Sequence, residues 1–176
     1  FRENWHFACH HSQLGENRAI ELHHMQDLIG EPMIATSSDK IRCLSNVCTH
    51  RGMLIVKDKC PNRAIKCGYH GRIFALDGSF RSMPEFEEVD CFPSSNDDLK
   101  SFSTFIWRGL VFAGINPSSL EPAIHEMEER IESIKKTIDK WDKNPFIQKK
   151  HRERLAMLSG SVGMVKVGAD SKVELK

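Results

Sequence analysis

Two short motifs, each combining one cysteine with one histidine, constrain the fold of this chain more than any other feature. The first is Cys48-Thr49-His50, and the second, sixteen residues further on, is Cys67-Gly68-Tyr69-His70. Thiolates and neutral imidazoles are strong ligands for transition metals. If the four side chains act together, the chain must fold so that two loops meet at one metal centre. The candidate metal- and cofactor-binding residues are therefore Cys48, His50, Cys67 and His70.

Three interpretations of the two motifs are open. They could be a coincidence of structural residues in a folded core. They could bind zinc, because two cysteines and two histidines suit tetrahedral Zn²⁺, although zinc fingers usually pair cysteine with cysteine and histidine with histidine. They could also hold a [2Fe–2S] cluster in which one iron takes both cysteines and the other takes both histidines. The alternation favours the cluster, because each loop must reach both irons and so needs one ligand of each kind.

A glycine follows each histidine closely, Gly52 in the first motif and Gly71 in the second. Glycine has no Cβ, so its backbone N–H can approach an inorganic sulfide. Such donors stabilise the extra negative charge of a reduced cluster and raise its reduction potential. We therefore expect these N–H groups to face the cluster. Ordinary turn chemistry is the alternative explanation for both glycines, and it is compatible with the same role.

The region between residues 18 and 116 consists mostly of short runs rich in Ile, Val and Leu, separated by turn residues such as Ser37-Ser38-Asp39. Runs of this length and spacing indicate a small antiparallel β sandwich or barrel. Asp77-Gly78 and Arg108-Gly109 each predict a hairpin, and the first is expected to be a two-residue type I′ turn. The expected strands cover residues 18–22, 31–36, 40–44, 54–57, 63–66, 72–76, 79–81, 105–107 and 110–115.

The pattern changes after Pro117, where apolar residues recur at steps of three and four from Ile124 to Trp141. This spacing predicts an amphipathic helix, which we expect to end near Asn144-Pro145 and to pack on the β domain. The fold class is therefore mainly β with a C-terminal amphipathic helix. The expected domains are residues 1–117, the helix at 118–145, and a C-terminal segment, 146–176, of unknown role that could be the remnant of a catalytic domain. Residues 162–167 and 173–175 are candidate strands.

Charge and composition exclude several classes of protein. The 25 Lys+Arg and 24 Asp+Glu leave a net charge of +1, which argues against a nucleic-acid binder and a polybasic membrane anchor. No apolar run is long enough to span a bilayer, and the first residues do not read as a secretory signal. The six cysteines favour free or metal-bound thiols, and hence a reduced, cytoplasmic compartment, over three disulfides. Because the chain begins at Phe1, we expect a trimmed sequence or the ordered part of a longer protein.

Several segments of residues 1–117 together resemble one known family, the Rieske [2Fe–2S] domain of ring-hydroxylating, non-haem iron oxygenase α subunits. The resemblance implies the Rieske fold, with Cys48 and Cys67 on one iron and His50 and His70 on the other, near the protein surface. The segments that carry it are residues 44–52, Cys67-Gly68-Tyr69-His70-Gly71, Asp77-Gly78, Asn4-Trp5-His6-Phe7, His10, Ser12-Gln13-Leu14, Gly30-Glu31-Pro32 and Trp107-Arg108-Gly109-Leu110-Val111-Phe112.

Two features distinguish this chain within the resemblance. Arg72 stands where the family usually has Trp, so we expect a more basic surface around the histidines, which could alter the docking partner. The alternative is that Arg72 merely covers the loop. Rieske proteins of respiratory cytochrome complexes have an extra cysteine in each loop, whereas residues 51–53 and 68–69 contain none. This favours an oxygenase or ferredoxin type, towards the negative end of the Rieske range of about −150 to +300 mV.

The resemblance implies a function in one-electron transfer. A reductase or ferredoxin would supply electrons, and the acceptor would be a mononuclear Fe(II) in an oxygenase catalytic domain or in the neighbouring subunit of a homotrimer. That iron, expected only in an intact oxygenase, would hydroxylate or dioxygenate an organic substrate. A free-standing Rieske ferredoxin is the alternative, and a structural zinc module is a third. Neither nucleic acid nor a membrane is an expected partner.

A complete mononuclear iron site is not visible in the sequence. Such sites use two histidines and one carboxylate. Beyond His70 only His125 and His151 remain, and neither has Asp or Glu three residues before it. We therefore assign no catalytic residue, and this chain alone is not expected to hydroxylate a substrate.

Two upstream groups of histidines also invite a metal-binding interpretation. Glu3, His6 and His10 have triad-like spacing, but they lie in a segment that resembles the family's first strand. We expect His6 and His10 to be packed or hydrogen-bonded. The adjacent His23-His24 is expected in a polar loop or at a strand edge.

Overall fold

The strands of the described chain all lie between residues 6 and 114 and pair antiparallel. The structure is a computed structural model, and it describes residues 3–15, 19–61, 63–86, 90–140 and 144–158. The chain divides into two units, Phe1–Ser119 and Leu120–Lys176, each of which we describe by itself. Among the described residues, no helix is both long enough and apolar enough to cross a membrane.

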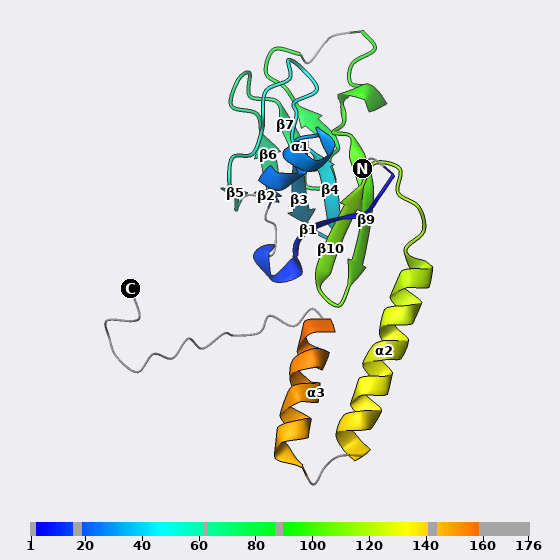
Figure 1. Ribbon diagram of the computed structural model, residues 1–176. Coiled ribbons are helices and arrows are strands. Elements are labelled where there is room, and N and C mark those ends of the chain that lie inside the picture. The colour runs from blue at the N-terminus through cyan, green and yellow to red at the C-terminus, as the bar shows by residue number, and fades with distance from the viewer. Residues whose placement is uncertain (1–2, 16–18, 62, 87–89, 141–143, 159–176) are drawn as a thin grey trace, which may run out of the picture. The chain divides into compact units, whose positions relative to one another are not determined.

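A seven-stranded sheet is the larger of the two sheets in the first unit (Figure 1). All of its neighbouring strands are antiparallel. This confirms the expected mainly-β class. In spatial order the strands are β1 (His6–His10), β10 (Leu110–Gly114), β9 (Ser101–Trp107), β4 (Ile41–Ser45), β3 (Met33–Ser37), β2 (Ala19–Glu21) and β5 (Lys59–Cys60).

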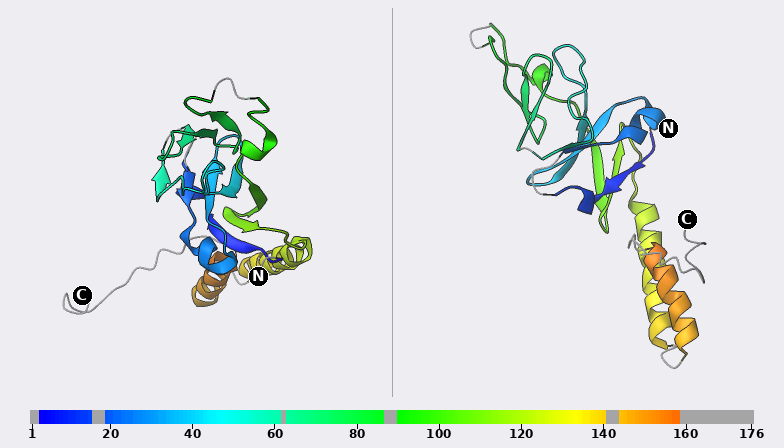
Figure 2. Two further views of the ribbon diagram at one scale, coloured as in Figure 1. Left: turned by 90° about the horizontal axis from the view of Figure 1, so that it is seen from above. Right: turned by 90° about the vertical axis from the view of Figure 1, so that its left-hand side faces the viewer.

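A second, three-stranded sheet carries one of the two motifs. It consists of β6 (Ala64–Lys66), β7 (Ile73–Ala75) and β8 (Phe80–Ser82). The second motif forms the loop between β6 and β7, and the first motif follows β4 of the large sheet. Figures 1 and 2 show the small sheet at one end of the large one. The two motif loops are therefore presented by two different sheets of the same unit.

Two local expectations were wrong. Residues 54–57 do not form a strand, because only Leu54 makes an isolated bridge, to Val47. The expected loop or strand edge at His23-His24 is instead the start of helix α1 (His23–Ile29), which ends at Gly30 in the left-handed region. Apolar periodicity over so short a helix is too weak to separate it from a strand or loop. Two 3₁₀ turns, η1 (His11–Gln13) and η2 (Ser95–Asp97), were also not expected.

Both expected hairpins are present, but the type I′ geometry belongs to the other one. Arg108 and Gly109 have φ values of 47° and 86°, and Trp107 pairs directly with Leu110, as a two-residue type I′ turn requires. In the Asp77-Gly78 turn only Gly78 has a positive φ, 94°, and its N–H donates to Ala75 O at 3.0 Å. The turn between β7 and β8 is therefore longer than the expected one, and our type I′ assignment there was wrong.

We expect Gly78→Ala to lower the free energy of unfolding of the first unit by about 2–3 kcal/mol, because the left-handed backbone is strained for alanine. The new Cβ would also lie 3.2 Å from Leu44 Cδ2 and 3.3 Å from Leu99 O. Gly30→Ala is the matched control, since Gly30 has a φ of +74° but no heavy atom within 4 Å of the added Cβ. Urea unfolding should show a loss of only about 1 kcal/mol for the control. An equal loss of unfolding free energy in the two variants would show that the contacts with Leu44 and Leu99 add nothing to the cost.

The hydrophobic core of the first unit contains both motif cysteines. Cys48 and Cys67 are 3% and 2% exposed, and they belong to one buried cluster with Phe74, Leu44 and Ile65. A second buried cluster is built around Met25, Met33 and other residues of the large sheet and α1. The motif thiols are thus part of the folded core, and the rest of their loops extends from it towards the surface.

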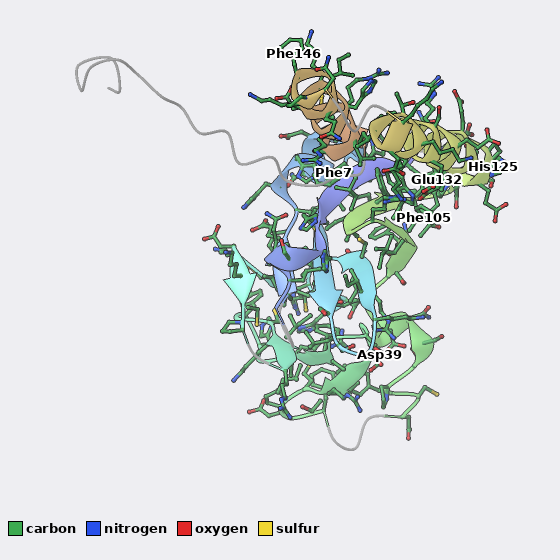
Figure 3. All side chains as sticks on the ribbon, turned by 90° about the horizontal axis from the view of Figure 1, so that it is seen from below. Phe7, Asp39, Phe105, His125, Glu132 and Phe146 are labelled. Atoms are coloured by element: carbon green, nitrogen blue, oxygen red, sulfur yellow. The ribbon has the colours of Figure 1, made fainter. Side chains whose placement is uncertain are left out.

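A row of aromatic rings lies over β1, β9 and β10. Ring centroids are 5.9 Å apart for Trp5 and Phe105, 6.5 Å for Phe105 and Phe112, and 6.2 Å for Phe7 and Phe112. Phe7 remains 48% exposed. Figure 3 labels Phe7 and Phe105 on their strands. These rings pack on one another rather than in the core.

The second unit contains two helices, α2 (Glu121–Lys140) and α3 (Pro145–Leu158), which lie side by side (Figures 1 and 2). The expected helix is present as α2, with Ile131 and Ile134 of its apolar stripe buried. Helix α3 was not expected. We read Asn144-Pro145 as the end of a helix, but the Asn144 side chain accepts from the N–H of Phe146 and of Ile147, at 3.2 Å each, and so caps the start of α3. The candidate strands at 162–167 and 173–175 lie outside the described residues.

Candidate metal centre

The first motif forms a tight loop that is closed by two backbone hydrogen bonds. The Cys48 N–H donates to Met53 O at 2.8 Å, and the Gly52 N–H donates back to Cys48 O at 3.0 Å. Gly52 has a φ of 71°, which a residue with a side chain adopts only with strain. The glycine four residues after the cysteine is therefore what allows the chain to turn back.

The second motif repeats this backbone design. The Cys67 N–H donates to Arg72 O at 2.8 Å, and the Gly71 N–H donates to Cys67 O at 3.1 Å, with φ of 74° at Gly71. The glycine again follows the cysteine by four residues, although the histidine follows by two residues in the first loop and by three in the second. Two loops of one design thus present His50 and His70 from slightly different positions.

This geometry corrects our expectation for the two glycines. We expected the N–H groups of Gly52 and Gly71 to face an inorganic sulfide, but each donates to the carbonyl of the cysteine in its own loop. Their left-handed backbone is the reason for glycine at both positions. Turn chemistry therefore accounts for both glycines by itself.

The two thiols lie together below the surface. Burial is the main effect that raises the pKa of Cys48 above its ordinary value, and the neighbouring Cys67 raises this pKa further. The backbone N–H groups of His50 and Arg51 act in the opposite direction, because they stabilise a negative Cys48 sulfur. All six cysteines are free thiols in this structure. Two buried sulfurs side by side are costly to ionise alone, and a metal cation would remove that cost.

The two imidazoles meet nearer to the surface. The ring centroids of His50 and His70 are 4.7 Å apart, and Tyr69, which is 61% exposed, stacks on His70 at 3.8 Å. Burial, followed by the proximity of His70, Arg51 and Arg72, lowers the pKa of His50. A lowered pKa keeps this imidazole neutral at physiological pH, which is the form that binds a metal.

The structure therefore sorts the four predicted ligands by element, with sulfur next to sulfur and nitrogen next to nitrogen. Among the residues that the structure describes, no group of three or more His, Cys, Asp or Glu side chains could hold one metal ion. A single tetrahedral ion requires all four ligands to converge. A [2Fe–2S] cluster needs two separate pairs, each on its own iron. The donor set and its pairing fit that cluster.

Arg72 does not make the surface around the histidines basic, so that expectation was wrong. Its side chain is buried, and its Nη1 donates to Thr49 Oγ1 at 2.8 Å while Nη2 forms an ion pair with Asp97. The guanidinium carbon lies 4.9 Å from the ring centroid of Phe80 and 5.5 Å from that of Phe92. The alternative reading, that Arg72 covers the loop, is closer to the structure. Nothing in the sequence around Asp97 marks it as the partner.

The upstream histidines do not form a metal site in the described part of the chain. His10 Nδ1 lies 2.6 Å from Ser12 Oγ and accepts from the Ser12 N–H, so it caps the η1 turn. His24 Nε2 lies 2.9 Å from Phe7 O. His23 lies 3.6 Å from Glu21 Oε1 and from Asp58 Oδ1, at the surface. These are packing and hydrogen-bonding roles, as we expected for His10.

Comparison with known proteins places both motifs in one family. Residues 4–93, about half of the chain, match the family model described as the Rieske [2Fe-2S] domain. The chain is 29% identical over 138 residues to the carnitine monooxygenase oxygenase subunit of Acinetobacter pittii, covering 74% of this chain and 36% of that protein. It is 31% identical over 91 residues to the large oxygenase component of the 2,4-dinitrotoluene dioxygenase system of Burkholderia sp., covering 51% of this chain and 20% of that protein.

Solved structures agree with this match. The crystal structure of the apo form of a quaternary ammonium Rieske monooxygenase superposes with a TM-score of 0.65 at 26% identity, covering 76% of this chain and 40% of that one. Naphthalene 1,2-dioxygenase with bound indole shares the fold, with a TM-score of 0.56 at 22% identity, over 65% of this chain and 26% of that one. The chain thus spans well under half of the length of these relatives.

Proposed function

The chain belongs to the Rieske [2Fe-2S] domain family, and from this premise we propose that it transfers single electrons through a cluster held by Cys48, His50, Cys67 and His70. The observation that carries the proposal is the pairing of the ligands, with two thiols inside the core and two imidazoles 4.7 Å apart nearer to the surface. When bound, a [2Fe–2S] cluster accepts and releases one electron.

Each pair of ligands would have a distinct role. Cys48 and Cys67 would hold one iron within the core, where the buried hydrophobic residues around Phe74 exclude water. His50 and His70 would hold the other iron at the edge that faces a partner. The exposed side chains of Tyr69 and Met53, 61% and 39% exposed, lie on the same two loops as these histidines. Arg51 is also exposed on the first of these loops, so the surface beside the histidines offers a partner both apolar contact and a positive charge.

We further propose that the acceptor is a non-haem iron oxygenase centre. The relatives that support this are an oxygenase subunit of a carnitine monooxygenase and a large oxygenase component of a dioxygenase system. A reductase or ferredoxin would be the donor, and the catalytic domain of the same or a neighbouring subunit, as in a homotrimer, would be the acceptor. The mononuclear Fe(II) would belong to that intact oxygenase. The substrate would be chosen in its catalytic domain.

Metal and sulfide analysis tests the proposed cofactor. We expect the purified full chain to contain two irons and two acid-labile sulfides for each polypeptide, because both thiols and both imidazoles are needed for one cluster. One electron equivalent should reduce it, as followed by visible absorption during a reductive titration. A chain that contains zinc and no labile sulfide would instead support the structural zinc module and refute the proposal.

A further inference from the structure

We propose that Arg72, which is buried, and Asp97, which is partly buried, form a pair of opposite charges that positions the two ligand loops and sets the reduction potential of the cluster site. This inference rests on the proposed function. It concerns Arg72, the residue that follows Gly71 in the second ligand loop. Neither residue would touch a metal, so both are positioning residues.

Arg72 connects three segments of the chain. Arg72 follows Gly71 in the second loop, and its Nη1 donates to Thr49 Oγ1 at 2.8 Å. Thr49 lies between Cys48 and His50 in the first loop, and its hydroxyl donates to Asp97 O at 2.8 Å. The two ligand loops are therefore joined to each other, and to the η2 turn, through one guanidinium and one hydroxyl.

Both charges lie largely out of contact with water. The side chains of Arg72 and Asp97 are only 3% and 18% exposed. Three aromatic rings surround the guanidinium, with centroids 5.9, 4.9 and 5.5 Å from its central carbon, at Phe74, Phe80 and Phe92. Water screens charges poorly in such surroundings, so each charge acts over a longer distance than it would at the surface.

Asp97 is held as a carboxylate. Its Oδ2 accepts from the Ser94 N–H at 2.8 Å and from Ser94 Oγ at 3.0 Å, while Oδ1 accepts from Arg72. Burial alone would raise the pKa of Asp97, but these hydrogen bonds outweigh it and keep the pKa below the ordinary value. The charge of Arg72 lies beside both ligand loops, because Arg72 follows His70 by two residues and its Nη1 donates to Thr49 Oγ1, which lies between Cys48 and His50.

The sign of the effect follows from the charge that reduction adds. A reduced cluster carries one more negative charge, so a nearby cation stabilises it and raises the potential, whereas a nearby carboxylate lowers the potential. In the native pair the two effects oppose each other. Removing Arg72 alone leaves an unbalanced negative charge, and removing Asp97 alone leaves an unbalanced positive one. The two single changes must therefore shift the potential in opposite directions.

A redox titration of the cluster-loaded full chain tests this sign. We expect Arg72→Gln to decrease the equilibrium constant for reduction by about tenfold and Asp97→Asn to increase it by a similar factor, which corresponds to about 59 mV for one electron. The double variant R72Q/D97N should return towards the wild-type value. Arg81→Gln is the matched control, because it removes an exposed arginine of the same unit and should leave the potential unchanged.

The outcomes separate an electrostatic role from a merely structural one. If the substitutions merely loosened the loops, the reduction potentials of both single variants would shift in the same direction. That result would overturn the inference, and so would potentials that differ from wild type by no more than that of the Arg81→Gln control. If the Arg72→Gln variant loses its cluster, the Arg72→Lys and Asp97→Asn variants test the inference instead. Arg72→Lys keeps the positive charge and should therefore keep the reduction potential of the wild type. A lowered potential in Arg72→Lys would then refute the charge argument. If the purified wild-type protein proves to contain no iron and no labile sulfide, the proposed function is overturned, and this inference with it.

Discussion

Replacing His50 by Ala is expected to abolish the electron-spin resonance signal of a reduced Rieske cluster. The signal depends on one iron having two neutral nitrogen ligands, and the ring of His50 lies 4.7 Å from that of His70, with no other candidate nitrogen ligand from these two loops. The His70→Ala variant should behave in the same way. A spectrum of the dithionite-reduced protein, recorded with the iron content of the same sample, measures the effect.

His23→Ala is the control for this experiment. His23 is exposed at the start of α1 and contacts Glu21 and Asp58 rather than either loop, so its removal should leave the signal intact. Replacing His50 by Cys supplies a thiolate in place of the imidazole and should also remove the Rieske signal, because that iron then has one nitrogen and one sulfur ligand instead of two nitrogen ligands. A full signal in the His50→Ala variant would contradict the ligand assignment directly.

Phe74→Ala should lower the free energy of unfolding of the first unit by about 3–5 kcal/mol, because it removes a large side chain and leaves a cavity in the core. Phe74 lies in β7, is fully buried, and belongs to the same buried cluster as Cys48 and Cys67. The cavity should therefore also weaken cluster retention. Urea unfolding of the full chain measures the stability, and iron released to a chelator over time measures the retention.

Phe7→Ala provides the matched comparison, since Phe7 belongs to the same unit but is 48% exposed. It contacts the ring of Phe112 at the surface, so the loss should stay near 1 kcal/mol. Similar losses for the two variants would show that the region around Phe74 is not a tightly packed core. Faster iron release from the Phe7→Ala variant than from Phe74→Ala would contradict the proposed link between that core and the cluster.

Features that depend on neighbours along the chain could be predicted from the sequence. Alternating Ile, Val and Leu runs between turn residues indicated the mainly-β class, and the apolar steps from Ile124 onward indicated helix α2. The cysteine and histidine spacing indicated the family, which the match of residues 4–93 confirms. The assignment of Cys48, His50, Cys67 and His70 as ligands stays a prediction that the experiments above address.

Features that depend on distant segments could not be predicted. The local pattern at Asp77-Gly78 suited a type I′ turn, but the actual turn also accommodates Leu44 and Leu99, which lie against Gly78. Residues 54–57 have strand-like composition but no partner strand, because pairing is decided by what lies alongside. Asn144-Pro145 suits both the end of one helix and the start of the next, and the backbone beyond it decides between these.

The sequence by itself determined which ligand types this protein offers, their grouping into two loops, and the β architecture that carries them, since these follow from residue type and local spacing. Only the tertiary structure decided that the sulfurs pair inside the core, that the imidazoles pair nearer to the surface, and that Arg72 is buried against Asp97 and three phenylalanines. The physical reason is that burial and electrostatic pairing depend on groups that are distant in the chain, and their proximity exists only once the chain has folded.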